Sequence, residues 1–215
     1  MNTPSRPVAG PRPPVPAALH SARSHSGLVV PYITAWHAGR PMWGHVAEQA
    51  QARAITDGLC QVCGLELDDT RIVLTVRPQD IAAAVAPEPG LHPACLRYAV
   101  AACPMLSGTR PLYRPVGHGP GPCDQPDCDC ALWAPADSVG RAEQPAEAWY
   151  ELWISPADYR PTAYSTNGRQ QIGISLRDVR PRRMRKIRAS EPGASHAELE
   201  PVIDLTIATT ALFSK

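Results

Sequence analysis

The sequence lacks the features that mark membrane-spanning, exported and strongly charged proteins. No stretch approaches about eighteen uninterrupted apolar residues, so no membrane span is predicted. The first residues carry scattered basic side chains without an apolar segment behind them, so no secretory signal is predicted. The net charge is only +1, and a case for nucleic-acid or membrane binding therefore needs a local patch.

Large aromatic side chains are also scarce, whereas proline and cysteine are not. Phe occurs once and Pro 25 times in 215 residues, which indicates that less of the chain is packed core than its length suggests. The seven cysteines are an odd number, and they cluster at metal-ligand spacings. A disulfide framework in an exported chain would favour an even number. We therefore expect a cytoplasmic protein with reduced cysteines, and export is the less favoured alternative.

Composition divides the chain into four regions. Residues 1–27 are rich in Pro, Ser and Ala with almost no large apolar side chains, which predicts a disordered Pro-rich tail. Residues 28–110 contain the first cysteine cluster. Residues 111–135 form a Cys/His-rich loop, and residues 136–215 are predicted to be a β-rich region with a basic run.

Local patterns predict a mixture of helices and strands, and hence an α+β fold. Runs of helix formers indicate helices over 45–56 and 92–103. Apolar and β-branched runs indicate strands over 70–78, 148–155 and 162–176. Inside the last of these, Asn167-Gly168 is typical of a tight hairpin turn, because both residue types accept a positive φ.

Four residues of the second region have the spacing of a closed zinc site. They form C-x2-C and H-x2-C pairs: Cys60, Cys63, His92 and Cys95. A two-residue gap lets one tight turn aim both side chains at one ion, and Gly64 suits such a turn. Four protein ligands leave no open position for water, so we expect a structural zinc. The alternative is a set of buried free cysteines that pack as small apolar groups.

The residues around these pairs resemble the treble-clef zinc finger, and in particular the frame of HNH endonucleases. The likeness lies in "ARAITDGLCQVCGLEL" and "GLHPACLRYAVAAC", and it covers residues 48–104. It implies that residues 28–110 form a treble-clef-like zinc-binding domain. Together, "PYITAW", "LCQVCG" and "AVAACP" more closely resemble a group of uncharacterised actinobacterial zinc-finger proteins, and that likeness implies no activity.

The nuclease implied by the HNH frame meets an objection. In that family a catalytic histidine lies between the two ligand pairs, whereas here the interval between Cys63 and His92 contains none. Asp68 and Asp69 are candidate magnesium ligands, but no suitable general base stands beside them in sequence. We expect these aspartates to form a turn, and we predict no catalytic residues.

The loop after the second region carries a second group of metal-ligating residue types. Its members are His118, Cys123, Cys128 and Cys130. Their number suits a second zinc ion, although the spacing matches no finger. A redox-active thiol pair and a disordered Cys-rich loop are the alternatives, and the acidic neighbours speak against a redox thiol, which needs an electropositive setting.

A basic run near the C-terminus is the one local patch of charge. It contains Arg180, Arg182, Arg183, Arg185, Lys186 and Arg188. Clustered cations release counterions from a phosphate backbone and so give affinity for nucleic acid. A solvated face or a linker is the commoner fate of such a run.

The sequence therefore favours a non-catalytic zinc-binding accessory or regulatory protein, with nucleic acid as the partner expected of the basic run. The alternative is a protein–protein adaptor built on a structural zinc finger. A third interpretation is an enzyme, either a diverged HNH-like nuclease or another metal-dependent catalyst. No membrane partner is expected.

Overall fold

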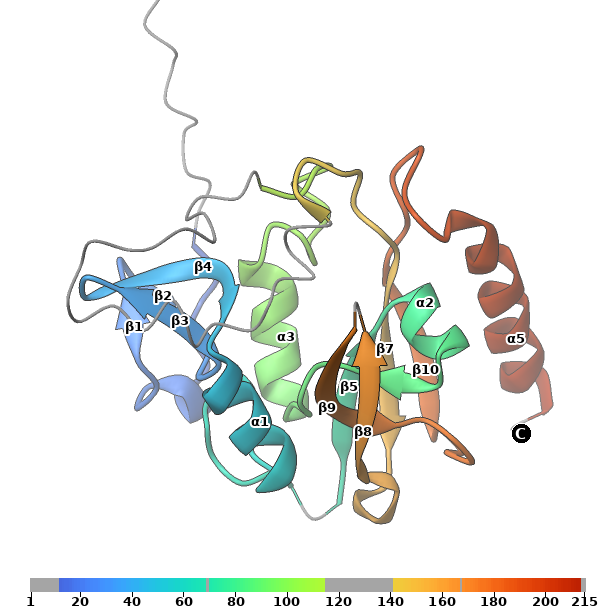
Figure 1. The fold of residues 1–215 in the computed structure, drawn as a ribbon, viewed down its shortest axis with the longest axis horizontal. Coiled ribbons are helices and arrows are strands. Elements are labelled where there is room, and N and C mark those ends of the chain that lie inside the picture. Colours follow the sequence, from blue (N-terminus) through green and yellow to red (C-terminus); the bar gives the residue numbers. More distant parts are fainter. Residues whose placement is uncertain (1–11, 69, 115–140, 167, 214–215) are drawn as a thin grey trace, which may run out of the picture.

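The computed structural model shows a mixed α+β fold (Figure 1) and describes residues 12–68, 70–114, 141–166 and 168–213. The helices are α1 (Glu48–Thr56), α2 (Pro78–Ala82), α3 (Pro93–Ala102) and α5 (Glu200–Phe213). Single 3-10 turns lie at η1 (Ala17–Leu19), η3 (Pro156–Asp158) and η4 (Ala197–Leu199). In this part of the chain no helix has the length and apolar character needed to cross a bilayer.

The strands form two hairpins and two three-stranded sheets, all antiparallel. The hairpins pair β1 (Ser24–His25) with β2 (Leu28–Val29), and β3 (Thr34–His37) with β4 (Arg40–Val46). One sheet has the order β10-β7-β5, from β5 (Ile72–Val76), β7 (Trp149–Ile154) and β10 (Arg183–Arg188). The other has the order β6-β9-β8, from β6 (Val85–Ala86), β8 (Pro161–Thr166) and β9 (Arg169–Ser175).

Both three-stranded sheets join strands that are far apart in the sequence. In one, β5 pairs with β7 from Ile72 opposite Ile154 to Val76 opposite Tyr150. In the other, β6 pairs with β9. Residues 28–110 and 136–215, which composition separates, therefore share their sheets and pack together.

The β10-β7-β5 sheet is covered on both faces, with α3 on one side and α5 on the other (Figure 1). On the α5 side, Leu74 and Leu152 belong to a cluster that includes Ile203 of the helix. On the α3 side, Val73 packs with Leu96. All five residues of β5 are buried. A strand covered on both faces does not alternate between apolar and polar residues. Burying each such aliphatic side chain contributes about 1.5–3 kcal/mol.

Most of the predicted elements are present, and their ends have local causes. Helix α1 stops before Asp57-Gly58, where Gly58 takes φ +66°, as the left-handed end of a helix requires. Helix α3 begins with Pro93 in its first turn, where a missing N–H costs nothing. The strands over 70–78, 148–155 and 162–176 appear as β5, β7 and the β8–β9 hairpin.

Two segments for which no helix or strand was predicted are regular, and one expectation is wrong in part. The basic run contains strand β10. Its two apolar residues pack on different faces of the sheet, Met184 against the cluster on the α5 side and Ile187 against the cluster on the α3 side. The apolar segment at the C-terminus is helix α5. The predicted tail 1–27 is wrong for residues 12–27, because Leu19 is 1% exposed in the core on the α3 side.

Candidate metal centre

A tight knuckle presents the first two cysteines. Leu59 and Glu66 form an antiparallel bridge, and inside it the Cys60 N–H donates to the Leu65 carbonyl at 2.8 Å. The Gly64 N–H donates to the Cys60 carbonyl at 2.9 Å, which closes the turn. Gly64 takes φ +72°, a conformation that other residues adopt only with strain. The turn expected from the C-x2-C-G sequence is therefore present.

The knuckle is held against the segment that precedes β3. The Tyr32 N–H donates to the Val62 carbonyl at 3.0 Å. The Tyr32 ring lies so close to Gly64 that an added Cβ there would be 2.7 Å from the ring. A side chain at position 64 is therefore disfavoured for two reasons, the positive φ of the backbone and the contact with the Tyr32 ring.

The second pair of ligands is placed by the sheet and by the start of α3. Val73 of β5 and Leu91 exchange two backbone hydrogen bonds, of 3.0 and 2.8 Å. This pairing sets His92 at the N-cap of α3 and Cys95 in its first turn. The Gln61 N–H donates to the Gly90 carbonyl at 3.0 Å, which joins the knuckle to the same segment.

The four predicted ligands converge on one point. The ligand atoms of Cys60, Cys63, His92 and Cys95 all lie within 4.8 Å of one another. The His92 Nδ1 atom lies 3.4 Å from Cys63 Sγ and 3.7 Å from Cys95 Sγ. A tetrahedral ion with bonds of about 2.3 Å to sulfur and 2.0 Å to nitrogen places these atoms about 3.5 Å apart. The group can therefore hold a metal ion of this geometry.

The second nitrogen of His92 supports the same assignment. The Nε2 atom lies 2.8 Å from the backbone carbonyl of Glu66. Because a carbonyl only accepts, Nε2 carries a proton, which leaves Nδ1 as the atom that would bind an ion placed among the three sulfur atoms. Metal-binding histidines almost always donate their other ring N–H in this way, which fixes the ring and its tautomer.

The site concentrates negative charge in a buried place. Cys60 is 0% and Cys95 2% exposed, whereas Cys63 and His92 are half-buried. Hydrogen bonds from Cys63 and Cys95 hold the pKa of the Cys60 thiol well below its ordinary value of 9.0. Hydrogen bonds with Cys60 and Cys63 raise the pKa of His92 to about 10. A buried thiolate of this kind needs a cation beside it.

Other residues considered with the metal site lie apart from it. Cys103 caps the far end of α3 and is not part of the ligand group. Asp68 accepts a hydrogen bond from the Thr70 N–H at 2.7 Å, so it forms the expected turn. Asp69 and the second cluster, His118, Cys123, Cys128 and Cys130, lie outside the described residues.

The cations of the basic run differ in their contacts. Lys186 forms ion pairs with Glu200, at 2.8 Å, and with Asp204 of α5. Arg188 has a side chain only 5% exposed, and it forms an ion pair with Glu191 at 2.6 Å. These two cations hold the fold together, whereas Arg180, Arg182, Arg183 and Arg185 are exposed.

A buried ionic cluster was not predicted from the sequence. Arg77 at the end of β5 donates twice to Asp80 at 2.9 Å, and its Nη1 atom lies 3.6 Å from Glu147. The Tyr113 hydroxyl donates to Glu147 at 3.0 Å. Arg77, Asp80 and Glu147 are each less than 10% exposed. The capping position of Asp80 at the start of α2 is local in sequence, whereas Glu147, just before β7, is 67 residues beyond Asp80 and could not be identified as a partner.

Glu88 joins the knuckle to the sheet from inside. Its Oε2 atom accepts a hydrogen bond from Thr75 of β5 at 3.0 Å and one from Gln61 of the knuckle at 3.4 Å. Burial raises the pKa of the Glu88 carboxyl above its ordinary value of 4.5, although Arg77 and Thr75 oppose this rise. The fold therefore favours the protonated carboxyl.

This raised pKa predicts a pH-dependent difference between the wild type and Glu88→Gln. The folded state keeps the Glu88 proton to a higher pH than the unfolded state does, so the wild type loses stability as pH rises from about 4 through the raised pKa. The amide does not titrate, so Glu88→Gln should gain stability relative to the wild type over that window. Urea unfolding at several pH values measures the difference, and parallel stability curves would contradict the prediction.

Comparisons with protein-family models, with curated proteins and with solved structures find no match for this chain. The geometry of the Cys60, Cys63, His92 and Cys95 group is therefore the observation on which a functional proposal rests.

Proposed function

We propose that this chain is a non-catalytic zinc-binding accessory or regulatory protein whose Cys60, Cys63, His92 and Cys95 hold one structural zinc ion. The observation that carries the proposal is the convergence of three thiols and an imidazole whose second nitrogen is already engaged. Thiolate and imidazole ligands in tetrahedral arrangement favour zinc over the hard cations, which prefer oxygen.

A structural rather than catalytic role follows from the number of ligands. Four protein ligands complete the tetrahedron, so no position is left for a water molecule to be activated. The ion would crosslink the knuckle to α3 inside the cluster that contains Val73 and Leu96. Folding and metal binding are coupled in sites of this kind.

The order of elements supports a treble-clef-like arrangement. The knuckle, the Val73–Leu91 pairing and the ligand-bearing start of α3 follow one another along the chain. Helix α1 precedes the knuckle, as the HNH frame requires. A diverged nuclease stays the least favoured interpretation, because Asp68 is engaged in a turn and the interval lacks a histidine.

Nucleic acid is the partner that we propose for the exposed part of the basic run. The supporting observation is that Arg182 Nη1 lies 3.4 Å from the Thr70 carbonyl, a few residues after the knuckle, so that the run and the metal site are neighbours. The alternative is a protein–protein adaptor. It is favoured by α5, which exposes Val202 at 63% and Leu205 at 69%.

Metal analysis of the full chain, purified under reducing conditions, tests the proposal. We expect one zinc per chain that is lost in Cys60→Ser and Cys63→Ser and kept in Cys103→Ser. A second zinc that is lost in Cys123→Ser would identify the second cluster as a site. Cobalt substitution gives an independent readout, because thiolate-bound tetrahedral Co²⁺ absorbs strongly in visible light. A wild type without zinc, or one that keeps it in both ligand variants, would refute the proposal.

A further inference from the structure

We propose that one end of the β10-β7-β5 sheet is a surface that binds the phosphate backbone of nucleic acid. This inference rests on the proposed nucleic-acid function, and it assigns the binding to a set of residues that differs from the basic run. The surface, here called the arginine edge, consists of Arg71, Arg180, Arg182, Arg183 and Arg185. It includes one residue from outside the basic run and leaves out Lys186 and Arg188.

The topology of the sheet brings Arg71 to the basic run. Strands β5 and β10 both run antiparallel to β7, so they begin at the same end of the sheet. Trp153 of β7 pairs with Val73 on one side and with Arg183 on the other. Arg71, just before β5, and the residues at the start of β10 therefore lie at the same level.

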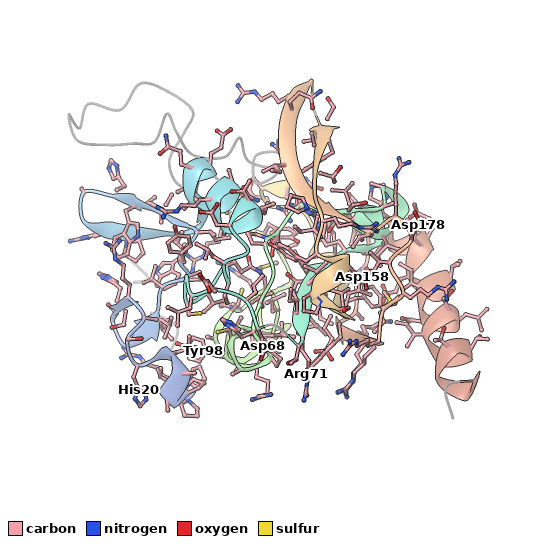
Figure 2. All side chains as sticks on the ribbon, turned by 90° about the horizontal axis from the view of Figure 1, so that it is seen from below. His20, Asp68, Arg71, Tyr98, Asp158 and Asp178 are labelled. Carbon is pink, nitrogen blue, oxygen red and sulfur yellow. The ribbon has the colours of Figure 1, made fainter. Side chains whose placement is uncertain are left out.

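A direct contact connects the two segments. The Arg182 N–H donates to the Trp153 carbonyl at 2.8 Å, and its guanidinium reaches the Thr70 carbonyl at 3.4 Å. Thr70 is the residue before Arg71, so the Arg182 side chain reaches across β7 to the backbone next to Arg71. In Figure 2, Arg71 points outward from the molecule at this end.

The arginines of this edge differ from the other cations of the run in what they contact. Among the described residues, Arg71, Arg180 and Arg185 are exposed and have no ion pair within 4.0 Å. Arg183 lies over the Trp153 ring at 5.6 Å and near Glu151 at 4.0 Å, which holds its guanidinium in place. Lys186 is neutralised by the carboxylates of α5.

The edge keeps an excess of positive charge. Figure 2 labels Asp68, Asp158 and Asp178 on the segments that adjoin it, and Glu151 lies 4.0 Å from Arg183, so that four carboxylates of the described residues accompany the five guanidiniums. Asp68 is also occupied by its hydrogen bond from Thr70. The remaining charge suits a polyanion rather than a single carboxylate ligand.

The dimensions suit a phosphate backbone. One strand separates β5 from β10, so their backbones lie about 10 Å apart. One strand of B-DNA presents a phosphate about every 3.4 Å along its axis, so about three phosphates face this span. Guanidinium groups bind phosphate through two parallel hydrogen bonds, which favours arginine over lysine at such a surface. No base-specific contact is implied.

Fluorescence anisotropy with a labelled twenty-nucleotide oligomer, single-stranded or duplex, tests the inference on the full chain. Each lost phosphate contact lowers affinity about eightfold at about 0.1 M salt and lowers the salt slope by nearly one. We expect this loss for Arg71→Ala and for Arg182→Ala. Arg169→Ala removes an exposed arginine at the tip of the β8–β9 hairpin, away from the edge, and should bind as the wild type does.

The outcomes separate the surface from the function. A wild type that binds neither oligomer would overturn both the nucleic-acid function and the arginine edge. Binding that falls in Arg182→Ala but not in Arg71→Ala would keep the function and reject the edge. An equal fall in Arg169→Ala would show that only overall charge matters, which also rejects it. Far-UV circular dichroism checks that each exposed-site variant is folded.

Discussion

Chelation of the zinc ion that we propose at Cys60, Cys63, His92 and Cys95 is expected to abolish most of the stability of this protein. Structural zinc sites contribute about 10–16 kcal/mol in small peptides, against a total stability of about 5–15 kcal/mol for a typical protein. Cys60 and Cys95 lie within a core cluster shared by Val73, Leu91 and Leu96. Without the ion, this cluster would bury a Cys60 thiolate whose counter-charge is lost.

We expect a strong chelator to lower Tm by at least about 20 °C, or to remove the cooperative transition, and added zinc to restore it. Lowering the pH acts in the same direction, because the cysteine thiols must lose their protons to bind the ion, and acid opposes this loss. Thermal melts followed by circular dichroism, with and without chelator, measure the effect. Cys103→Ser is the matched control and should respond to chelator as the wild type does. An unchanged Tm after verified metal removal would contradict the structural role.

Replacing Arg77 by Met is expected to cost about 3–5 kcal/mol of unfolding free energy, because it removes the ion pair of the buried Asp80 carboxylate and leaves the buried Glu147 carboxylate with Arg141. The guanidinium is bound by Asp80 through two hydrogen bonds and lies 3.6 Å from Glu147. It also lies over the Trp149 ring at 5.6 Å. The variant therefore loses packing as well as charge.

Denaturant unfolding of Arg77→Met, Glu147→Gln and the double variant measures the coupling between these two residues. We expect the double variant to be less destabilised than the sum of the single ones, since each single change removes one buried partner of the other charge and leaves Arg77 with Asp80 or Glu147 with Arg141. Arg53→Met is the control: its ion pair with Asp57 is exposed, so its loss should cost less than about 1 kcal/mol. Additive effects of the two buried changes would show that the residues act separately.

Local signals made part of the metal site predictable. The C-x2-C-G sequence favours a tight turn because glycine adopts the conformation found at Gly64, φ +72°, without the strain that other residues incur. Pro93 and the helix formers after it predict α3 and place His92 and Cys95 at its start. The two pairs of ligands were assigned to one ion on the basis of residue type and spacing alone. Their ligand atoms do converge in the structure.

The partners of charged residues were not predictable in the same way. The basic run has the same character along its length in sequence, yet Arg188 is buried against Glu191 and Lys186 is paired with α5. Which of its cations stay free depends on strand direction and on the docking of a helix. The ionic cluster of Arg77 with Glu147 likewise depends on the register of β5 against β7.

The sequence by itself thus determined the residues whose structure depends on near neighbours: the knuckle, the helix with two ligands and the β8–β9 hairpin. The tertiary structure alone decided that the knuckle region and the C-terminal region share two sheets. It also decided that Leu19 belongs to the core, and that the Arg182 side chain reaches the Thr70 carbonyl, next to Arg71 in the chain. The physical reason is that turns and caps arise from interactions over a few residues, whereas strand pairing and burial depend on the contacts of the whole chain.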